Sequence, residues 1–267
     1  MDFTSIINEI KSGVAHLLFI DSEGKRIGSG SGFLSGGKLI TCDHVIRMPM
    51  PNGAKVYIRF EDNSADNPDE FIELDAGDLS SKVVASSPED KNDFAVLEIP
   101  GIDYDERYNF ELGSVDDDVN VGVEILFLGY PFEHLNLVAH RGYISSIYPA
   151  GNKVIIQIDG SVNSSNSGGP LMHPYTKKVV GIITRKSTGL AKEFDQLIAS
   201  LDTNIQLLSR PMSGSVQMMG IDPVKALLAT QTQLKIVAQN MKRSSNVGIG
   251  YAFSLEKLVE AVEKVAV

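Results

Sequence analysis

Short β-prone segments separated by turn residues fill the first two thirds of the chain and limit the folds open to it. Val, Ile, Phe and Tyr, which are enriched in strands, recur in short runs bounded by Gly, Pro, Asn, Asp and Ser. The runs are VAHLLFI, GFLSGGKLITC, KVYIRF, KVVAS and FAVLEI, then VEILFLGY, LVAHRGYISSI, KVIIQI and KVVGIITR. No segment before residue 190 alternates strand with helix, which disfavours a parallel α/β sheet. We therefore predict an all-β fold of two antiparallel β-barrels.

Two acidic, turn-rich segments divide these strands. EDNSADNPDEFIELDAGD interrupts the first series and is interpreted as a solvated loop. PGIDYDERYNFELGSVDDDV separates the two series and is interpreted as a linker. We predict a first barrel lobe over residues 14–115 and a second lobe over residues 116–188 and 247–267.

The spacing of apolar residues becomes helical at both ends of the chain and after residue 188. In residues 1–13, Phe3, Ile6, Ile7 and Ile10 stand at i, i+3, i+4 and i+7, which predicts an amphipathic N-terminal helix. At the other end, SLEKLVEAVEKV predicts a closing helix with Ser254 as its N-cap. Between the strands KVVGIITR and GIGYAFS we predict a helical insertion over residues 189–246, whose two helices are separated by RPMSGS. Its apolar positions are Phe194, Leu197, Ile198, Leu201, Ile205 and Leu208, then Leu227, Leu228, Leu234, Val237 and Met241.

Composition excludes several classes of partner. The formal charge is −10 and the pI is near 5.0, which argues against nucleic acid or an anionic membrane as a ligand. The amino terminus lacks a basic region followed by an apolar run, and no segment is long and apolar enough to span a membrane. Cys42 is the single cysteine, so an intrachain disulfide is impossible and a reducing compartment is permitted. We predict a cytoplasmic protein.

Three residues supply the parts that acyl transfer needs. The reaction requires a nucleophile, a base that takes its proton, a group that orients the base, and donors for the oxyanion. His44 ends an apolar strand in LITCDHVI, Asp93 opens one in KNDFAVLEI, and Ser167 stands in NSGGPL. Two of them belong to the first lobe and one to the second, so the spacing predicts a site between the lobes.

The same segments carry a resemblance to a known family. The chain resembles the chymotrypsin-type serine proteases, and within them the bacterial HtrA/Deg branch, in GSGSGFLSGGKLITCDHVI, NDFAVLEI, VGVEILFLGYPF, DGSVNSSNSGGPL and NVGIGYAFSLEKL. The resemblance implies that His44 is the general base, that Asp93 orients it, and that Ser167 attacks the scissile carbonyl. We expect no PDZ module, because the chain ends just after the last helix.

Ser165 departs from the family pattern. The family normally has glycine two residues before the nucleophile, where its backbone N–H joins that of the nucleophile in the oxyanion hole. A Cβ disfavours the backbone conformation that aims this N–H inward, by on the order of 1–2 kcal/mol. The sequence therefore predicts a weak or latent resting enzyme in which the N–H of Ser165 is turned away from the site in a substantial fraction of molecules. If the helical insertion is the control element, a contact on it biases the same loop.

The resemblance also places the substrate pocket and the insertion. Ser161 and Val162 are expected near the pocket floor, Gly250 on the opposite wall, and Ile183 and Thr184 on the strand that pairs with the substrate. Because these residues include no carboxylate, we predict cleavage after small or medium apolar residues rather than lysine or arginine. The insertion leaves the chain beside this cleft. It is interpreted either as a packing or self-association element or as a lid or dock for a protein partner.

We predict a serine endopeptidase that acts on polypeptides and needs no cofactor or metal, since the histidines lack the spacing of metal ligands. Cys42 is interpreted as a small buried strand residue. Two alternatives stay open. One is a protease-like module that binds peptides or proteins with little turnover; the other is a scaffold in which the helices carry the function.

Overall fold

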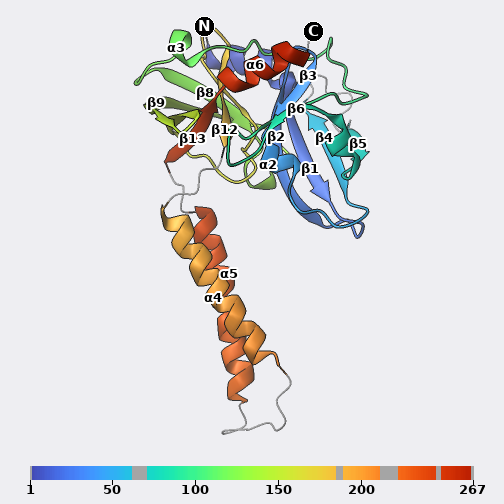
Figure 1. Cartoon of the computed structure of the whole chain (residues 1–267), viewed down its shortest axis with the longest axis vertical. Coiled ribbons are helices and arrows are strands. Elements are labelled where there is room, and N and C mark those ends of the chain that lie inside the picture. Colours follow the sequence, from blue (N-terminus) through green and yellow to red (C-terminus); the bar gives the residue numbers. More distant parts are fainter. Residues whose placement is uncertain (1, 62–70, 185–188, 211–221, 245–247, 266–267) are drawn as a thin grey trace. The chain divides into compact units, whose positions relative to one another are not determined.

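The computed structural model describes residues 2–61, 71–184, 189–210, 222–244 and 248–265. The chain divides into two compact units (Figure 1). One unit comprises Met1–Arg185 and Gly248–Val267 and contains every strand in the described residues; the other, Lys186–Val247, is the helical insertion. No described helix has the length and apolar content needed to cross a membrane.

The first lobe is a sheet of seven strands in the order β5-β4-β1-β2-β3-β7-β6, each antiparallel to its neighbours. Within the described residues its edge strands do not pair, so this lobe is a half-barrel sheet, and with the second lobe it forms the predicted two-lobed antiparallel fold. The strands are β1 (Val14–Ile20), β2 (Arg26–Ser35), β3 (Lys38–Thr41), β4 (Lys55–Phe60), β5 (Phe71–Asp75), β6 (Val83–Ser87) and β7 (Phe94–Leu97).

Strand β5 lies inside the segment that was interpreted as a solvated loop. Phe71–Asp75 pairs with β4, and the ring of Phe71 packs against the edge of Tyr57 at a centroid distance of 5.0 Å. The residues before it, 62–70, lie outside the described residues. The interpretation was therefore wrong for FIELD, because a cross-strand aromatic pair outweighs the acidic composition around it.

The second lobe is a closed barrel of six strands in the order β10-β13-β12-β11-β8-β9, which confirms the prediction for this half of the fold. Residues between β12 and β13 include the whole insertion, yet these strands pair directly, with Ile183 opposite Ala252. The strands are β8 (Glu124–Gly129), β9 (Val138–Ala150), β10 (Lys153–Asp159), β11 (Pro170–Met172), β12 (Val179–Thr184) and β13 (Ile249–Ser254).

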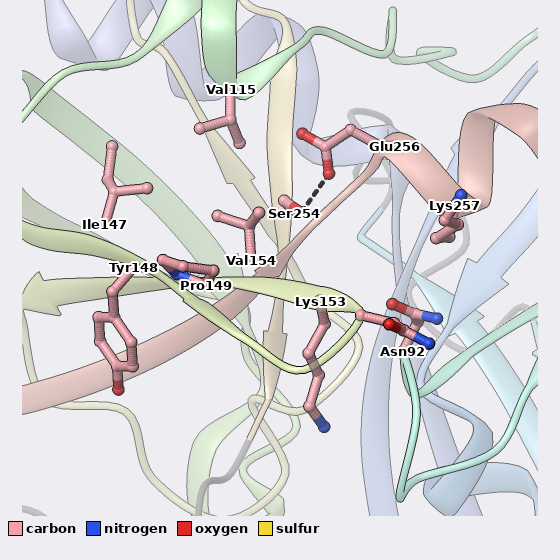
Figure 2. Close-up of a pocket in the computed structure, with 11 residues that line it drawn as sticks. Asn92, Val115, Ile147, Tyr148, Pro149, Lys153, Val154, Ser254, Glu256 and Lys257 are labelled. Atoms are coloured by element: carbon pink, nitrogen blue, oxygen red, sulfur yellow. Dashed lines mark hydrogen bonds between the residues drawn. The ribbon is translucent and has the colours of Figure 1, made fainter.

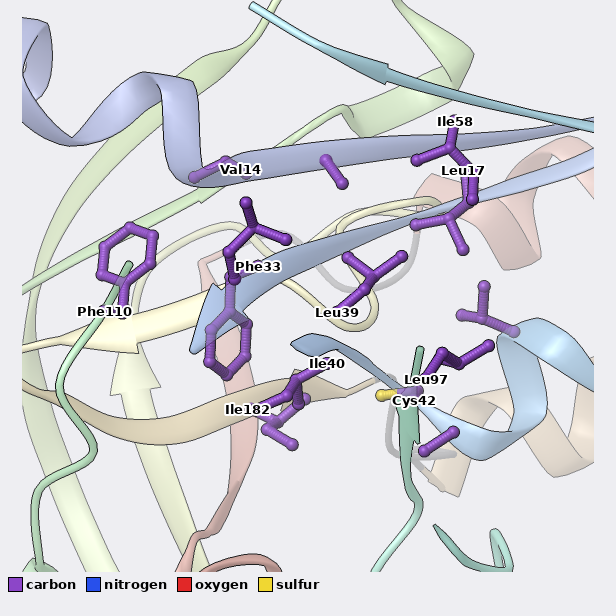
Figure 3. Packing of buried hydrophobic residues seen from close by; sticks show 14 of the residues in the cluster. Val14, Leu17, Phe33, Leu39, Ile40, Cys42, Ile58, Leu97, Phe110 and Ile182 are labelled. Atoms are coloured by element: carbon purple, nitrogen blue, oxygen red, sulfur yellow. The ribbon is translucent and has the colours of Figure 1, made fainter. Parts of the chain in front are cut away.

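Two apolar clusters hold the lobes. The larger fills the first lobe and extends to β12 and the last helix, and Figure 3 shows Cys42 within it beside Ile40 and Leu97. The smaller fills the closed barrel around Phe127 and Ile158. Cys42 is fully buried, which confirms its interpretation as a small core residue. Burial of its thiol raises its pKa well above the ordinary value.

Short helices cover the ends of these sheets. The amphipathic α1 (Phe3–Ile10) buries Ile6 and Ile10 in the larger cluster, followed by the 3-10 turn η1 (Lys11–Gly13). The closing helix α6 (Glu256–Val265) begins later than expected, since the Ser254 hydroxyl donates to the Glu256 carboxylate. The remaining short helices are α2 (Asp43–Ile46), η2 (Asp78–Lys82), α3 (Val115–Asp118) and η3 (Pro131–Glu133).

The insertion is a pair of helices, α4 (Gly189–Leu208) and α5 (Pro223–Ser244). Ion pairs join Lys235 to Asp202 and Lys242 to Asp195, and Leu201 and Ala238 are buried. The pair leaves many large apolar side chains about half exposed. They are Leu197, Leu207, Leu227, Leu234, Ile236, Val237 and Met241. Part of the predicted connecting loop RPMSGS lies outside the described residues.

Candidate active site

Strand pairing brings His44 and Asp93 together. Thr41 at the end of β3 pairs with Ala95 near the start of β7, so the residues just beyond these positions meet at one edge of the sheet. His44 lies on α2, which follows β3, and Asp93 directly precedes β7. His44 Nδ1 lies 2.8 Å from Asp93 Oδ2, and the backbone N–H of His44 donates to Asp93 Oδ1 at 3.1 Å.

The pair is electrostatically coupled. Burial of the imidazole alone would lower the pKa of His44, but the hydrogen bond and negative charge of Asp93 outweigh it and raise this pKa above 6.5. Burial would raise the pKa of Asp93, yet its hydrogen bonds from His44 hold that pKa below the ordinary value. Asp93 is 1% exposed, so its charge acts on His44 with little screening by water.

The Ser-Gly-Gly loop (residues 161–169) is pressed against the strands that lead to His44. The N–H of Ser31 on β2 donates to the Ser167 carbonyl at 2.8 Å, and the N–H of Gly168 donates to the Ile183 carbonyl at 2.8 Å. Gly168 has φ +89°, and a Cβ there would lie 2.1 Å from the Ser31 carbonyl oxygen and 3.0 Å from the Cys42 nitrogen. Only glycine fits this contact, which fixes Ser167 close to the segment that carries His44.

Ser165 has a left-handed backbone, with φ +73°. The carbonyl of Ser164 accepts a hydrogen bond from Phe132 N–H at 2.9 Å. In a trans peptide the N–H points away from the preceding carbonyl, so the Ser165 N–H is directed away from Phe132. Among the described residues no protein acceptor engages the N–H of Ser165 or of Ser167. The Ser164 carbonyl is thus engaged by Phe132, and the weak or latent resting enzyme stays a prediction.

Two serines of β2 hydrogen-bond to Ser165. Ser29 Oγ donates to Ser165 Oγ at 2.7 Å, and Ser31 Oγ donates to the Ser165 carbonyl at 2.7 Å. Ser31 Oγ also accepts from Tyr130 N–H at 3.0 Å. Sequence reasoning missed both serines. The available signal was the alternation in RIGSGSGF, where polar residues at i and i+2 share one face of a strand whose end is buried.

The residues predicted for the substrate pocket fall into two groups. Ser161, Val162 and Gly250 lie together: Ser161 Oγ accepts from Gly248 N–H, and a Cβ on Gly250 would lie 2.4 Å from Val162 Cγ2. Ile183 is instead fully buried in the barrel core. Thr184 is also buried, and its hydroxyl donates to Asp93 Oδ2 at 2.9 Å. The side chains of Ile183 and Thr184 therefore face the protein, and the predicted pairing of their strand with the substrate backbone stays a prediction.

Cys42, His44 and Asp93 also present three ligand-type atoms within 4.8 Å of one another. Asp93 already accepts from His44 and Thr184, and burial keeps the Cys42 thiol protonated, whereas metals bind the thiolate. The donor set therefore suits proton transfer better than a metal.

A pocket of about 360 Å³ lies apart from the triad (Figure 2). It is lined by Asn92, by the β9–β10 hairpin residues Tyr148, Lys153 and Val154, and by Glu256 at the start of α6. None of His44, Asp93 and Ser167 contributes to its lining. We assign this pocket no part in the chemistry.

A buried His–Asp pair beside a Ser-Gly-Gly turn, carried by two antiparallel β-lobes, is the arrangement of hydrolases that attack through a serine. The model of the family described as trypsin-like peptidase domain matches residues 30–182, and the chain belongs to this family.

Relatives agree with this assignment. A probable periplasmic serine endoprotease DegP-like of Rickettsia conorii is 30% identical over 174 residues, which cover 62% of this chain and 30% of that protein. Protease Do-like 5, chloroplastic, of Arabidopsis thaliana is 32% identical over 124 residues, covering 41% and 36% of the two chains. The chain thus matches about a third of the length of these relatives. Their names place them in the periplasm and the chloroplast, and a cytoplasmic location for this chain stays a prediction.

Solved structures share the fold. The HtrA-type protease AlgW with a decapeptide superposes with a TM-score of 0.59 and 16% identity, covering 100% of this chain and 68% of that one. The active form of the Rv3671c protease from M. tuberculosis gives a TM-score of 0.51 at 18% identity, covering 68% and 74% of the two chains. These neighbours bear out the two-lobed fold class.

Proposed function

We propose that the chain is a serine endopeptidase whose lobes, residues 14–115 and residues 116–188 with 247–267, cleave polypeptides through His44, Asp93 and Ser167. Ser167 Oγ attacks the scissile carbonyl while His44 Nε2 takes its proton, and the same imidazole then protonates the leaving amine. Asp93 holds the Nδ1–H tautomer that leaves Nε2 free to accept. A water molecule then attacks the acyl-enzyme while His44 takes its proton, and the second product leaves as Ser167 is regenerated.

The observation that carries this proposal is the 2.8 Å contact between His44 Nδ1 and the buried Asp93 carboxylate, next to a loop that the Ser31 N–H ties to Ser167. The Asp93 hydrogen bond and charge raise the pKa of His44. Elsewhere in the barrels His16 and His140 stack on Tyr130 and Phe127, and burial lowers the pKa of each. The contrast supports His44 as the base.

The oxyanion hole of this proposal consists of the N–H groups of Ser165 and Ser167. Both are free of protein acceptors in the described residues, and the left-handed Ser165 supports a hole that is formed at rest. This favours an active enzyme over both the latent enzyme and the binding module that the sequence left open.

Val162 supports a narrow specificity for small apolar side chains. It is 4% exposed and fills the space in front of Gly250, so little depth remains beside Ser161 for a long side chain. The absence of a carboxylate at Ser161, Val162 and Gly250 disfavours lysine and arginine, whose buried charge would have no partner.

The helical insertion, residues 189–246, is proposed as the surface for a protein partner or for a second copy of this chain. Seven large apolar side chains along α4 and α5 stay about half exposed, more than scattered surface residues require. The insertion follows β12 and precedes β13 in the chain, and these strands contain Thr184 and Gly250. Binding of a partner to the insertion can therefore act on the site through the two strands to which it is directly bonded.

A fluorophosphonate probe tests the catalytic proposal. The wild-type protein is expected to be labelled on Ser167 and to hydrolyse peptide amides, whereas Ser167→Ala and His44→Ala lose both properties. Ser22→Ala, which changes an exposed serine in the β1–β2 turn, is the control and retains both. Undiminished hydrolysis by purified Ser167→Ala would exclude the assignment.

A further inference from the structure

The unusual residue of this site is Ser165, because its conformation and its residue type are in conflict. Its φ of +73° lies in the left-handed region, which glycine enters freely and which a Cβ disfavours. Ser165 is 8% exposed, so its polar groups depend on protein partners rather than on water. Some feature of this chain must therefore hold residue 165 in place.

The feature that only a serine at 165 can use is its hydroxyl. Ser29 Oγ donates to Ser165 Oγ at 2.7 Å across a gap of 136 residues in sequence. Glycine would offer no atom for this contact, so the hydrogen bond exists only because of the departure from glycine. Ser29 is part of β2, a strand of the first lobe that pairs with β1 at Leu18 and is rigidly placed.

A second serine on the same face of β2, Ser31, binds the backbone carbonyl of Ser165. Ser31 Oγ donates to the Ser165 carbonyl, and Phe132 N–H donates to the Ser164 carbonyl before it. The side chain and both flanking carbonyls of Ser165 are thus engaged by partners outside the loop. With these three groups fixed, the N–H of Ser165 has one direction left, away from Phe132.

We propose that Ser29 is a positioning residue that keeps the oxyanion hole formed by latching the Ser165 hydroxyl. This inference rests on the proposed peptidase function. Ser29 touches no reacting atom; it acts only through Ser165. The Ser29–Ser165 pair replaces the glycine of the family by a serine whose left-handed backbone is stabilised from the neighbouring lobe. The serine at 165 is compatible with this backbone because the hydroxyl of Ser29 engages its side chain.

The proposal predicts non-additive kinetics. Ser29→Ala removes the latch and is expected to lower kcat roughly five- to tenfold with little change in KM, as expected for the loss of one partly buried hydrogen bond that supports the transition state. Ser165→Gly removes the hydroxyl that Ser29 contacts and adopts the left-handed backbone without a Cβ, so kcat in this variant should no longer depend on Ser29. In that background, Ser29→Ala has no further effect. Ser29→Thr retains a hydroxyl and restores most of the activity.

Ser35→Ala is the matched control, because Ser35 lies on the same strand and its buried hydroxyl donates to the Phe110 carbonyl at 2.8 Å. It is expected to lower Tm as Ser29→Ala does, but to leave kcat unchanged. The experiment measures kcat, KM and Tm for wild type, Ser29→Ala, Ser29→Thr, Ser165→Gly, the double variant and Ser35→Ala.

The outcomes separate the two proposals. An equal loss of kcat on Ser29→Ala in the Ser and Gly backgrounds, or no loss in the wild-type background, overturns the latch while the peptidase stands. If neither wild type nor Ser165→Gly hydrolyses peptides or reacts with a fluorophosphonate, the proposed function fails and the latch fails with it. Coupling confined to the wild-type background establishes the latch.

Discussion

Thr184 Oγ1 donates a hydrogen bond of 2.9 Å to the same carboxylate oxygen of Asp93 that lies 2.8 Å from His44 Nδ1. The donor comes from β12 of the closed barrel and the acceptor from the first lobe, so this bond joins the two lobes at the proposed catalytic pair. This hydrogen bond also explains why the buried strand VVGIIT ends in a polar residue.

Replacing this threonine tests the linkage. Thr184→Val keeps the shape and removes the donor, so Asp93 loses a hydrogen bond that stabilises its charge. We expect a loss of about 1–2 kcal/mol in the free energy of unfolding and a several-fold lower kcat. Denaturant titration and peptide hydrolysis measure the two effects. Thr203→Val, on an exposed face of α4, is the control and leaves kcat unchanged; an equal fall in kcat for both variants contradicts the assignment.

The raised pKa of His44 fixes the acid side of the pH–rate profile. Only the neutral imidazole can accept the Ser167 proton, so kcat/KM should fall as the pH drops through a value above 6.5. In Asp93→Asn the attraction is lost and burial dominates, so the acid limb moves to lower pH while kcat drops by roughly three to four orders of magnitude. A wild-type limb at or below 6.5, or one that Asp93→Asn moves upward, would refute this.

His16 should make the fold sensitive to acid. It is 1% exposed, and burial together with the charges of Arg59 and Arg26 lowers its pKa to about 4. A depressed histidine pKa means that the unfolded chain binds the proton first, so stability falls as the pH drops from about 6.5 to about 4, by on the order of 3 kcal/mol. His16→Phe, which retains the stacking on Tyr130, should flatten this dependence in denaturant titrations. An unchanged slope would rule out His16 as its source.

Val162 is expected to limit the side chain accepted before the scissile bond. A peptide library should show cleavage after Ala or Val in the wild type and a shift toward Leu and Met in Val162→Gly, which empties the space before Gly250. Gly250→Ala places a Cβ against Val162 and should reduce cleavage of every peptide. Lysine or arginine dominating the wild-type profile would contradict the pocket assignment.

The helical insertion can be tested separately from the barrels. Leu201 is 5% exposed and Leu197 is 47% exposed on the same helix. Leu201→Asn should reduce the helical signal in far-UV circular dichroism, while Leu197→Asn leaves the helices folded and weakens any association through the exposed face. Light scattering and hydrolysis rates measure the consequences. If the insertion controls the site, kcat changes more than the free energy of unfolding of the β-lobes does. A kcat equal to that of wild type in both variants contradicts that role.

The sequence predicted most of the fold because its periodicities are strong. Alternating and continuous β-prone runs gave the strands, and Leu201 and its neighbours gave the helices. Strand Phe71–Asp75 was missed since its pairing with β4 is a tertiary contact that an acidic composition conceals. The two-lobed antiparallel class was predicted correctly, whereas the half-barrel form of the first lobe depends on whether two edge strands meet, which no local pattern encodes.

The site divides in the same way. His44, Asp93 and Ser167 could be proposed from their motifs, because each stands just before or after a strand and acyl transfer demands its residue type. The conformation of Ser165 could not, because the rule that disfavours a Cβ there is local, whereas the hydroxyl of Ser29 that offsets it comes from a distant strand. The hydrogen bond from Thr184 to Asp93 was also missed, since sequence does not say that this hydroxyl faces the carboxylate.

The direct pairing of β12 with β13 has a consequence for the history of this chain. Lengthening a connection from about ten to about sixty residues adds only roughly 1–2 kcal/mol of closure entropy, so the barrel tolerates large replacements at this point. The connection between Thr184 and Ile249 is thus an insertion point, at which unrelated modules can be exchanged during evolution while the β-lobes stay the same. An engineer can use the same opening to install a sensor domain and place cleavage under the command of a chosen signal.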